Sequence, residues 1–172
     1  MKDYNSYFFD IDGTLIDTTG IIYKSCQKVC LKHAGFDPEF GFIASLTGLP
    51  LDRVIGNCLD GKCDYDMEQA IRDYKEYQSL IYKDYLKVFP HVNHVLGQLK
   101  SRGKKIAAVT SRRLESLKPY LTFTDSLQYF EVLVTPEMTT HHKPHPMPAI
   151  KAIDLLKTTP DQCLFIGDSI FD

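Results

Sequence analysis

The chain has 172 residues, enough for one compact domain or for a core domain with a smaller insertion. Its composition is that of an ordinary globular protein, with 44% hydrophobic and 24% charged residues. The formal net charge of −2, the lack of a basic block and the short apolar runs give no indication of a nucleic-acid partner or of a membrane.

The N-terminal half of the chain is predicted to be one buried strand followed by helices. The apolar run "SYFFDI" meets an Asp-Gly pair, which predicts a strand over residues 6–10. Apolar residues at helical spacing predict helices over 19–34, 50–58 and 66–87. No strand alternation occurs between residues 18 and 88, so this stretch is expected to be a helical insertion.

Strands and helices alternate in the second half of the chain, after Pro90. The predicted strands are "KKIAAVT", "FEVLVT" and "QCLFIGDS", and helices are predicted over residues 91–102, 113–120 and 146–157. This alternation is typical of an α/β fold with a doubly wound, Rossmann-like parallel sheet, in which the carboxyl ends of the strands meet at one edge. We therefore predict a core domain formed by residues 1–17 and 88–172, with residues 18–87 as an inserted helical cap.

The stretch "FFDIDGTLIDTT" places Asp10 and Asp12 two residues apart at the end of the first predicted strand. Two carboxylates so close together repel each other, and more strongly when desolvated, unless a cation or a proton lies between them. An ordinary Asp-Gly turn is the simpler explanation of this pair. Whether the pair has a catalytic function or only forms a turn can be judged from the residues that follow the other predicted strands.

Polar residues also follow the other predicted strands. Thr110 and Ser111 end the second, Lys143 follows the third in "HHKPHP", and Asp168 and Asp172 follow the last in "GDSIFD". Carboxylates suit Mg²⁺, whereas a hydroxyl, a lysine ammonium and backbone N–H groups beside a glycine bind phosphoryl oxygens. One carboxylate can attack phosphorus in line while a second acid protonates the leaving oxygen. The pattern therefore indicates phosphate chemistry with a hard divalent cation.

Four motifs, "DIDGTLID", "VTSR", "KPHPMP" and "GDSIFD", resemble those of the haloacid dehalogenase-like hydrolase superfamily. They occur in the same order over nearly the whole chain, and the helical insertion lies where that superfamily carries its C1-type cap. The segments "FEVLVTPE" and "KPHPMPAIKAI" are similar to the phosphoglycolate phosphatase and pyrophosphatase branch.

The resemblance implies a role for each motif residue. Asp10 would be the nucleophile that forms an aspartyl-phosphate, and Asp12 would be first the general acid and then the general base. Thr110 and Lys143 would bind the phosphoryl oxygens, together with the backbone at Gly13. The ligands of Mg²⁺ would be Asp10, the backbone carbonyl of Asp12, Asp168 and Asp172.

The expected function is thus that of a Mg²⁺-dependent phosphatase acting on a small phosphorylated metabolite, with phosphoglycolate as the leading substrate. Inorganic pyrophosphate, and a sugar phosphate in a hydrolase or a β-phosphoglucomutase-like reaction, are alternatives because the motifs handle only the phosphoryl group. A non-catalytic binding or regulatory protein on the same scaffold is the alternative of another class. The sequence leaves the oligomeric state open.

The superfamily's sheet ordinarily continues past the fourth motif, whereas this sequence stops at Asp172. A fragment and a natural truncation both remain open. We expect Asp172 to fray and the last strand to form an exposed sheet edge.

Several other residues have both a functional and a structural interpretation. The five cysteines do not suggest disulfides, and Cys26, Cys30 and His33 share a helix face, where core packing is favoured over a zinc site. Loop packing is likewise favoured over zinc for the histidines of "HHKPH". Asp17 is either a hinge residue or a helix cap, and Arg53 is either an exposed helix residue or a ligand of an anionic substrate tail. The N-terminus lacks the apolar stretch of a signal peptide, so a cytoplasmic location is expected.

Overall fold

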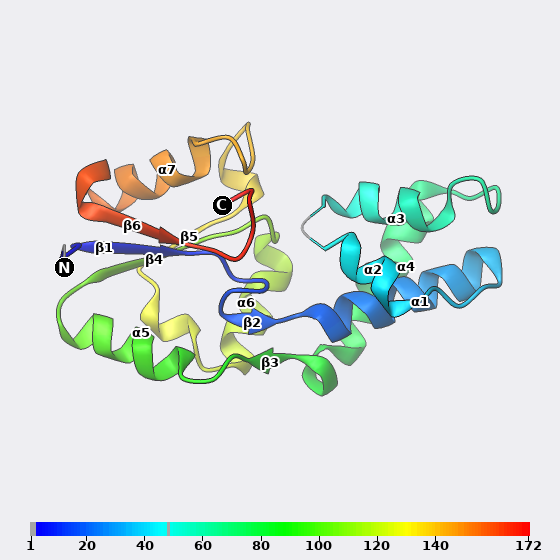
Figure 1. The fold of residues 1–172 in the computed structure, drawn as a ribbon, viewed down its shortest axis with the longest axis horizontal. Helices are drawn as coiled ribbons and strands as arrows, with labels where there is room; N and C mark the ends of the chain where they lie inside the picture. The colour runs from blue at the N-terminus through cyan, green and yellow to red at the C-terminus, as the bar shows by residue number, and fades with distance from the viewer. Residues whose placement is uncertain (1–2, 48) are drawn as a thin grey trace. The chain divides into compact units, whose positions relative to one another are not determined.

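A computed structural model describes residues 3–47 and 49–172, which divide into two units (Figure 1). The sheet unit joins the N-terminal segment up to Asp17 to Lys87–Asp172, and the helical unit is Thr18–Leu86. The chain thus leaves the sheet unit once, between Asp17 and Lys87, and returns to it.

The sheet unit contains, within the described residues, a sheet of four parallel strands in the order β5-β4-β1-β6. The strands are β1 (Ser6–Phe9), β4 (Lys105–Val109), β5 (Val132–Val134) and β6 (Cys163–Ile166). In the register of the sheet, Phe8 of β1 pairs with Ala107 of β4 and with Phe165 of β6. Parallel strands end at the same edge, so the segments that follow β1, β4, β5 and β6 lie near one another.

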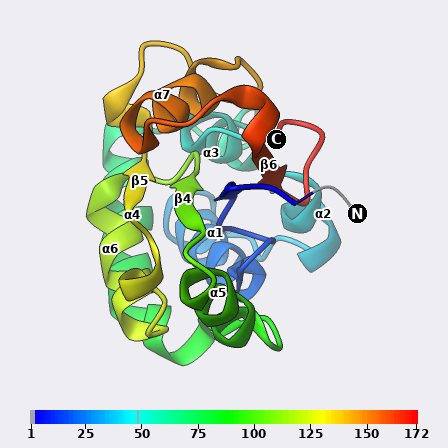
Figure 2. The ribbon, with the colours of Figure 1, turned by 90° about the vertical axis from the view of Figure 1, so that its left-hand side faces the viewer.

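Helices cover both faces of this sheet, with α7 on one face and α5 and α6 on the other (Figures 1 and 2). Their bounds are Val92–Ser101 (α5), Leu114–Phe123 (α6) and Met147–Leu156 (α7). Short 3₁₀ turns lie in the connections at Leu127–Tyr129 (η1), Pro136–Met138 (η2) and Pro160–Gln162 (η3). On the α7 face, the apolar core consists of Phe8, Ala107, Val109, Val134, Ala152 and Leu156. The predicted α/β fold class is confirmed.

A short antiparallel pair, β2 (Ile16–Asp17) and β3 (Lys87–Val88), was missed by the sequence patterns. The prediction that 66–87 is helical is wrong at its end. Helix α4 stops at Tyr85, where the backbone of Leu86 becomes extended. Two-residue strands are too short to show an alternation of apolar and polar residues, so only pairing across the fold defines them.

The helical unit contains α1 (Thr19–Ala34), α2 (Phe40–Ser45), α3 (Leu51–Leu59) and α4 (Met67–Tyr85). Two local signals delimit the long helices. Gly35 ends α1 in the left-handed conformation, and Asp66 begins α4 by accepting hydrogen bonds from the N–H groups of Glu68 and Gln69. Among the residues that the structure describes, no helix combines the length and the apolarity needed to span a membrane.

Three cysteines of the helical unit, Cys26, Cys30 and Cys58, are fully buried in its apolar core and are not in disulfides. A hydrogen bond with Cys58, and then burial, raises the pKa of the Cys30 thiol, and contact with Cys26 raises the pKa of Cys58 to about 12. Core packing is supported because, among the described residues, the group whose ligand atoms lie close enough to share a metal ion is made of aspartates and contains no cysteine. The third candidate ligand, His33, instead contacts Asp73, with 2.7 Å between Nε2 and Oδ2.

Within the described part of the helical unit, Asp73 of α4 is the carboxyl group whose pKa is clearly lowered, so its ionised form is stabilised. Its side chain is 7% exposed, and Lys32 Nζ and His33 Nε2 each lie 2.7 Å from Oδ2. The hydrogen bond from Lys32 contributes most to a pKa lowered to about 2. The folded pKa thus lies below the value of the unfolded chain, so ionised Asp73 stabilises the fold above about pH 4. This stabilisation is lost as the pH falls through the folded pKa.

We therefore expect Asp73→Asn to lower the free energy of unfolding at pH 7 by on the order of 1 kcal/mol. The variant should also lose less stability than wild type between pH 5 and pH 2.5. Thermal denaturation followed by circular dichroism at both pH values checks this. Asp64→Asn, at an exposed position, is the matched control. Parallel pH dependence in Asp73→Asn and wild type would contradict the assignment.

Candidate functional site

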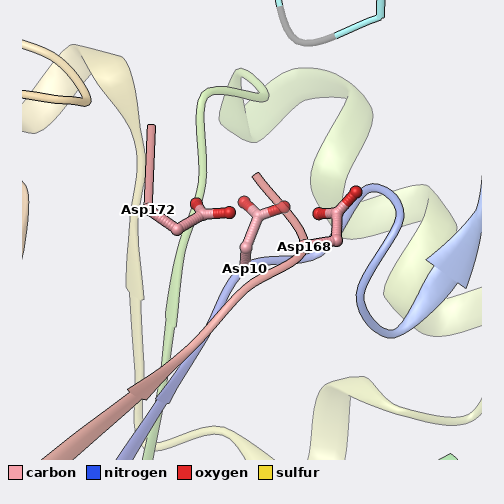
Figure 3. A group of neighbouring side chains, drawn as sticks. All are labelled: Asp10, Asp168 and Asp172. Atoms are coloured by element: carbon pink, nitrogen blue, oxygen red, sulfur yellow. The ribbon is translucent and has the colours of Figure 1, made fainter. Parts of the chain in front are cut away.

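Three carboxylates face one another where β1 and β6 end (Figure 3). Asp10 follows β1 directly, and Asp168 and Asp172 belong to the loop after β6. One carboxylate oxygen of each residue lies within 4.8 Å of the other two. Among the described residues, this is the group of His, Cys, Asp or Glu side chains that could share a metal ion. The structure thus brings together three of the acids that the sequence predicts as ligands.

Lys143, from the loop between β5 and α7, lies between two of these acids. Its Nζ is 2.6 Å from Asp10 Oδ1 and 2.5 Å from Asp172 Oδ1. All three side chains are at most 10% exposed. The ammonium group therefore balances part of the negative charge of Asp10 and Asp172.

Burial raises the pKa of Asp10 to about 6, and this effect exceeds the opposing influence of Lys143. The negative charges of Asp12 and Asp172 raise it further. The ionised form of Asp10 thus lacks enough positive charge around it. A divalent cation among the three carboxylates would supply that charge.

Two glycines allow the acids to approach the backbone. Gly13 has a φ of +85°, and a Cβ there would lie 2.2 Å from Asp168 Oδ2. A Cβ on Gly167 would lie 2.3 Å from Asp172 Cγ. Hydrogen bonds orient the same two acids: Thr14 Oγ1 donates to Asp168 Oδ1 at 3.1 Å, and the Ser169 N–H donates to Asp172 Oδ2 at 2.9 Å.

The Asp12 side chain does not join this group, although it was also predicted in the site. It is held by Arg112, whose Nε and Nη2 donate to the carboxylate at 2.7–3.1 Å. Thr110 is buried where β4 ends, and its Oγ1 accepts a hydrogen bond from the Arg112 N–H at 3.1 Å. Arg112 lies in the motif "VTSR", whose pattern assigns no role to it. Its position two residues after Thr110, at a strand end, is the signal that could have found it.

The other residues with a functional interpretation have the following surroundings, each within its own unit. The rings of His141 and His145 stack at 4.5 Å, and His145 Nδ1 accepts a hydrogen bond from the Met147 N–H, which supports loop packing. In the helical unit, Arg53 lines a polar surface pocket of about 180 Å³. Ser111 is exposed, and Asp17 lies in β2.

Comparisons with known proteins agree with the fold and the motifs. A relative from Caldanaerobacter subterraneus subsp. tengcongensis, provisionally named pyrophosphatase PpaX, is 37% identical over 95% of this chain and 73% of its own length. Pyrophosphatase PpaX of Bacillus cereus is 27% identical over 98% of this chain and 76% of its own. The crystal structure of a provisionally named haloacid dehalogenase-like hydrolase from Bacteroides fragilis is 28% identical, with a TM-score of 0.85 over 97% of this chain and 80% of that one.

The family model described as haloacid dehalogenase-like hydrolase matches residues 7–172, a range that contains all four motifs. This match confirms the resemblance inferred from the motifs, and with it the prediction of an enzyme of the hydrolase type. The chain belongs to the haloacid dehalogenase-like hydrolase family.

Proposed function

We propose that the chain is a Mg²⁺-dependent phosphatase that hydrolyses a small phosphate ester through an aspartyl-phosphate on Asp10. The observation that supports this most is the convergence of three carboxylates with the Lys143 ammonium at the end of β1 and β6. Metal-assisted phosphoryl transfer needs such a combination, because its transition state requires positioning and charge stabilisation more than further covalent chemistry.

The donor set suits Mg²⁺. Asp10, Asp168 and Asp172 offer hard carboxylate oxygens that lie within 4.8 Å of one another, and the Asp12 backbone carbonyl is proposed as a further ligand. When bound, the ion would supply positive charge to the carboxylate of Asp10 and to the phosphoryl oxygens. The pKa of Asp10, raised to about 6, is consistent with a site that is completed by a cation.

The geometry at Gly13 gives this metal assignment a direct test. In Gly13→Ala, the new Cβ would meet Asp168 Oδ2 at 2.2 Å, and the residue would also hold an unfavourable φ of +85°. Displacing Asp168 should weaken Mg²⁺ binding by at least about 10-fold, measured by calorimetric titration. Gly41→Ala is the control, because a Cβ there meets nothing within 4 Å. Equal affinities in the two variants would argue against Asp168 as a ligand.

The chain's own residues would divide the reaction between them. The Asp10 carboxylate attacks phosphorus, and Asp12 gives a proton to the leaving oxygen and later takes one from the attacking water. Lys143, Thr110 and the backbone at Gly13 hold the phosphoryl oxygens. Lys143 lies 2.6 Å from Asp10 Oδ1, close to the position where the phosphoryl group must arrive.

Two substrates are put forward. A phosphate monoester of the phosphoglycolate type follows from the motif segments, and inorganic pyrophosphate is favoured by the 37% identical relative that carries a pyrophosphatase name. The helical unit is proposed as the cap that selects between them. Within it, Arg53 and its polar pocket are candidates for binding an anionic group.

The test is phosphate release by the chain in the presence of Mg²⁺, with phosphoglycolate, pyrophosphate and a hexose phosphate measured side by side. We expect release with one clear preference, and its loss when EDTA removes the metal. If the chain is folded but releases no phosphate from any of the three, the phosphatase proposal is wrong, and a non-catalytic binding role becomes the better account.

A further inference from the structure

We propose that Arg112 is a positioning residue that orients the Asp12 carboxylate toward the leaving oxygen. The inference rests on the proposed function, in which Asp12 is the general acid. It assigns a role to a residue that is neither one of the three proposed carboxylate ligands nor one of the residues proposed to hold the phosphoryl oxygens.

The contact between Arg112 and Asp12 is bidentate. Nε lies 3.1 Å from Oδ1 and 2.9 Å from Oδ2, and Nη2 lies 2.7 Å from Oδ1. The Arg112 side chain is 10% exposed and that of Asp12 is 22% exposed. A planar guanidinium that donates to both oxygens restricts rotation of the carboxylate, which an ammonium acting as a point charge does not do.

Arg112 is itself held firmly. Its Cζ lies 4.3 Å from the ring centroid of Tyr120, a buried residue of α6, and its Nη1 is 3.4 Å from Ser116 Oγ on the same helix. Its backbone N–H donates to Thr110 Oγ1. The guanidinium is thus anchored to α6 and to the end of β4, whereas Asp12 belongs to the loop that follows β1. Helix α6 therefore restricts the position of the Arg112 guanidinium, and the guanidinium in turn restricts the orientation of the Asp12 carboxylate.

The two acids two residues apart consequently have different cationic partners. Lys143 contacts Asp10, and Arg112 contacts Asp12. As the bond from Asp10 to phosphorus forms and the ester P–O bond breaks, the leaving oxygen takes the proton of Asp12. Asp12 is then a carboxylate facing Arg112, and it regains a proton from water when water breaks the bond between phosphorus and Asp10. Only these proton transfers depend on the orientation of Asp12.

This dependence gives a selective test. An alkyl phosphate such as phosphoglycolate needs a proton on its leaving oxygen, whereas p-nitrophenyl phosphate has a leaving group that departs without one. The quantity to compare is kcat/KM, because it reports only the steps up to departure of the leaving group. For Arg112→Gln we expect kcat/KM on the alkyl phosphate to fall by about 10²-fold, and on p-nitrophenyl phosphate by less than about 3-fold.

Three further variants complete the experiment. Arg112→Lys keeps the positive charge but cannot donate to both carboxylate oxygens as a planar guanidinium does. It should therefore recover only part of the kcat/KM that Arg112→Gln loses on the alkyl phosphate. Asp12→Asn should show the same selectivity between the two substrates. Arg102→Gln removes an exposed arginine at the end of α5 and should change neither value.

The outcomes separate the inference from the proposed function. Equal losses on both substrates, or unchanged values in both Arg112 variants, would overturn the positioning role while leaving the phosphatase intact. If Arg112→Gln does not fold, Arg112→Lys decides by the same comparison. A wild-type chain that hydrolyses neither substrate would overturn the proposed function, and this inference with it.

Discussion

Replacing Asp10 by Asn should reduce phosphate release by at least about 10⁴-fold, because the amide cannot form the aspartyl-phosphate that the proposed mechanism requires. Rates are measured with the preferred substrate at saturating Mg²⁺. In wild type, acid quenching during turnover should trap a phosphorylated chain, and this species should be absent from the variant. A variant that keeps more than about one tenth of the wild-type rate would contradict the nucleophile assignment.

The same variant is not expected to unfold. The folded pKa of Asp10 is about 6, above the value of the unfolded chain. The group therefore favours the folded state below about pH 4, and this contribution is lost as the pH rises through the folded pKa. At pH 7.5 and without metal, ionised Asp10 costs stability, so Asp10→Asn should melt no lower than wild type. If Asp10→Asn melts at a lower temperature than wild type in metal-free buffer, the ion pair between Asp10 and Lys143 stabilises the fold by more than burial of the Asp10 charge destabilises it.

Removing the charge of Lys143 should separate catalysis from metal binding. We expect Lys143→Met to lower kcat/KM by about 10³-fold, because a cationic donor to the phosphoryl oxygens is lost in a site where such donors act strongly. Mg²⁺ affinity should not fall, since Asp10 and Asp172 lose the cation that lies 2.6 Å and 2.5 Å from their oxygens. Calorimetric titration and steady-state kinetics on the same preparation measure the two effects.

Lys118→Met is the matched control, because Lys118 is exposed on α6 and should affect neither quantity. A parallel loss of activity and Mg²⁺ affinity in Lys143→Met would indicate that Lys143 holds the carboxylates in place. Undiminished activity would exclude it as a donor to the phosphoryl group.

The local pattern of the sequence predicts the helices and strands that contain their own signals. Helix α1 has the predicted bounds of 19–34, because apolar spacing begins it and Gly35 ends it. Each strand of the sheet coincides with an apolar run that ends at polar residues. The sheet and the residues at its carboxyl edge could therefore be predicted together. The β2–β3 pair could not, because each strand depends on a partner about 70 residues away rather than on its own pattern.

The sequence by itself therefore predicted the α/β fold and the family, and it placed Asp10, Thr110, Lys143, Asp168 and Asp172 after the ends of strands. The tertiary structure alone decided how these side chains are partnered. Strand order places Arg112, 100 positions away, against Asp12, and it places Lys143 between Asp10 and Asp172. The physical reason is the distance along the chain over which each interaction is set. Hydrophobic periodicity is visible within a few neighbouring residues, whereas an ion pair forms between any charged groups that the packed sheet brings within a few ångströms of each other.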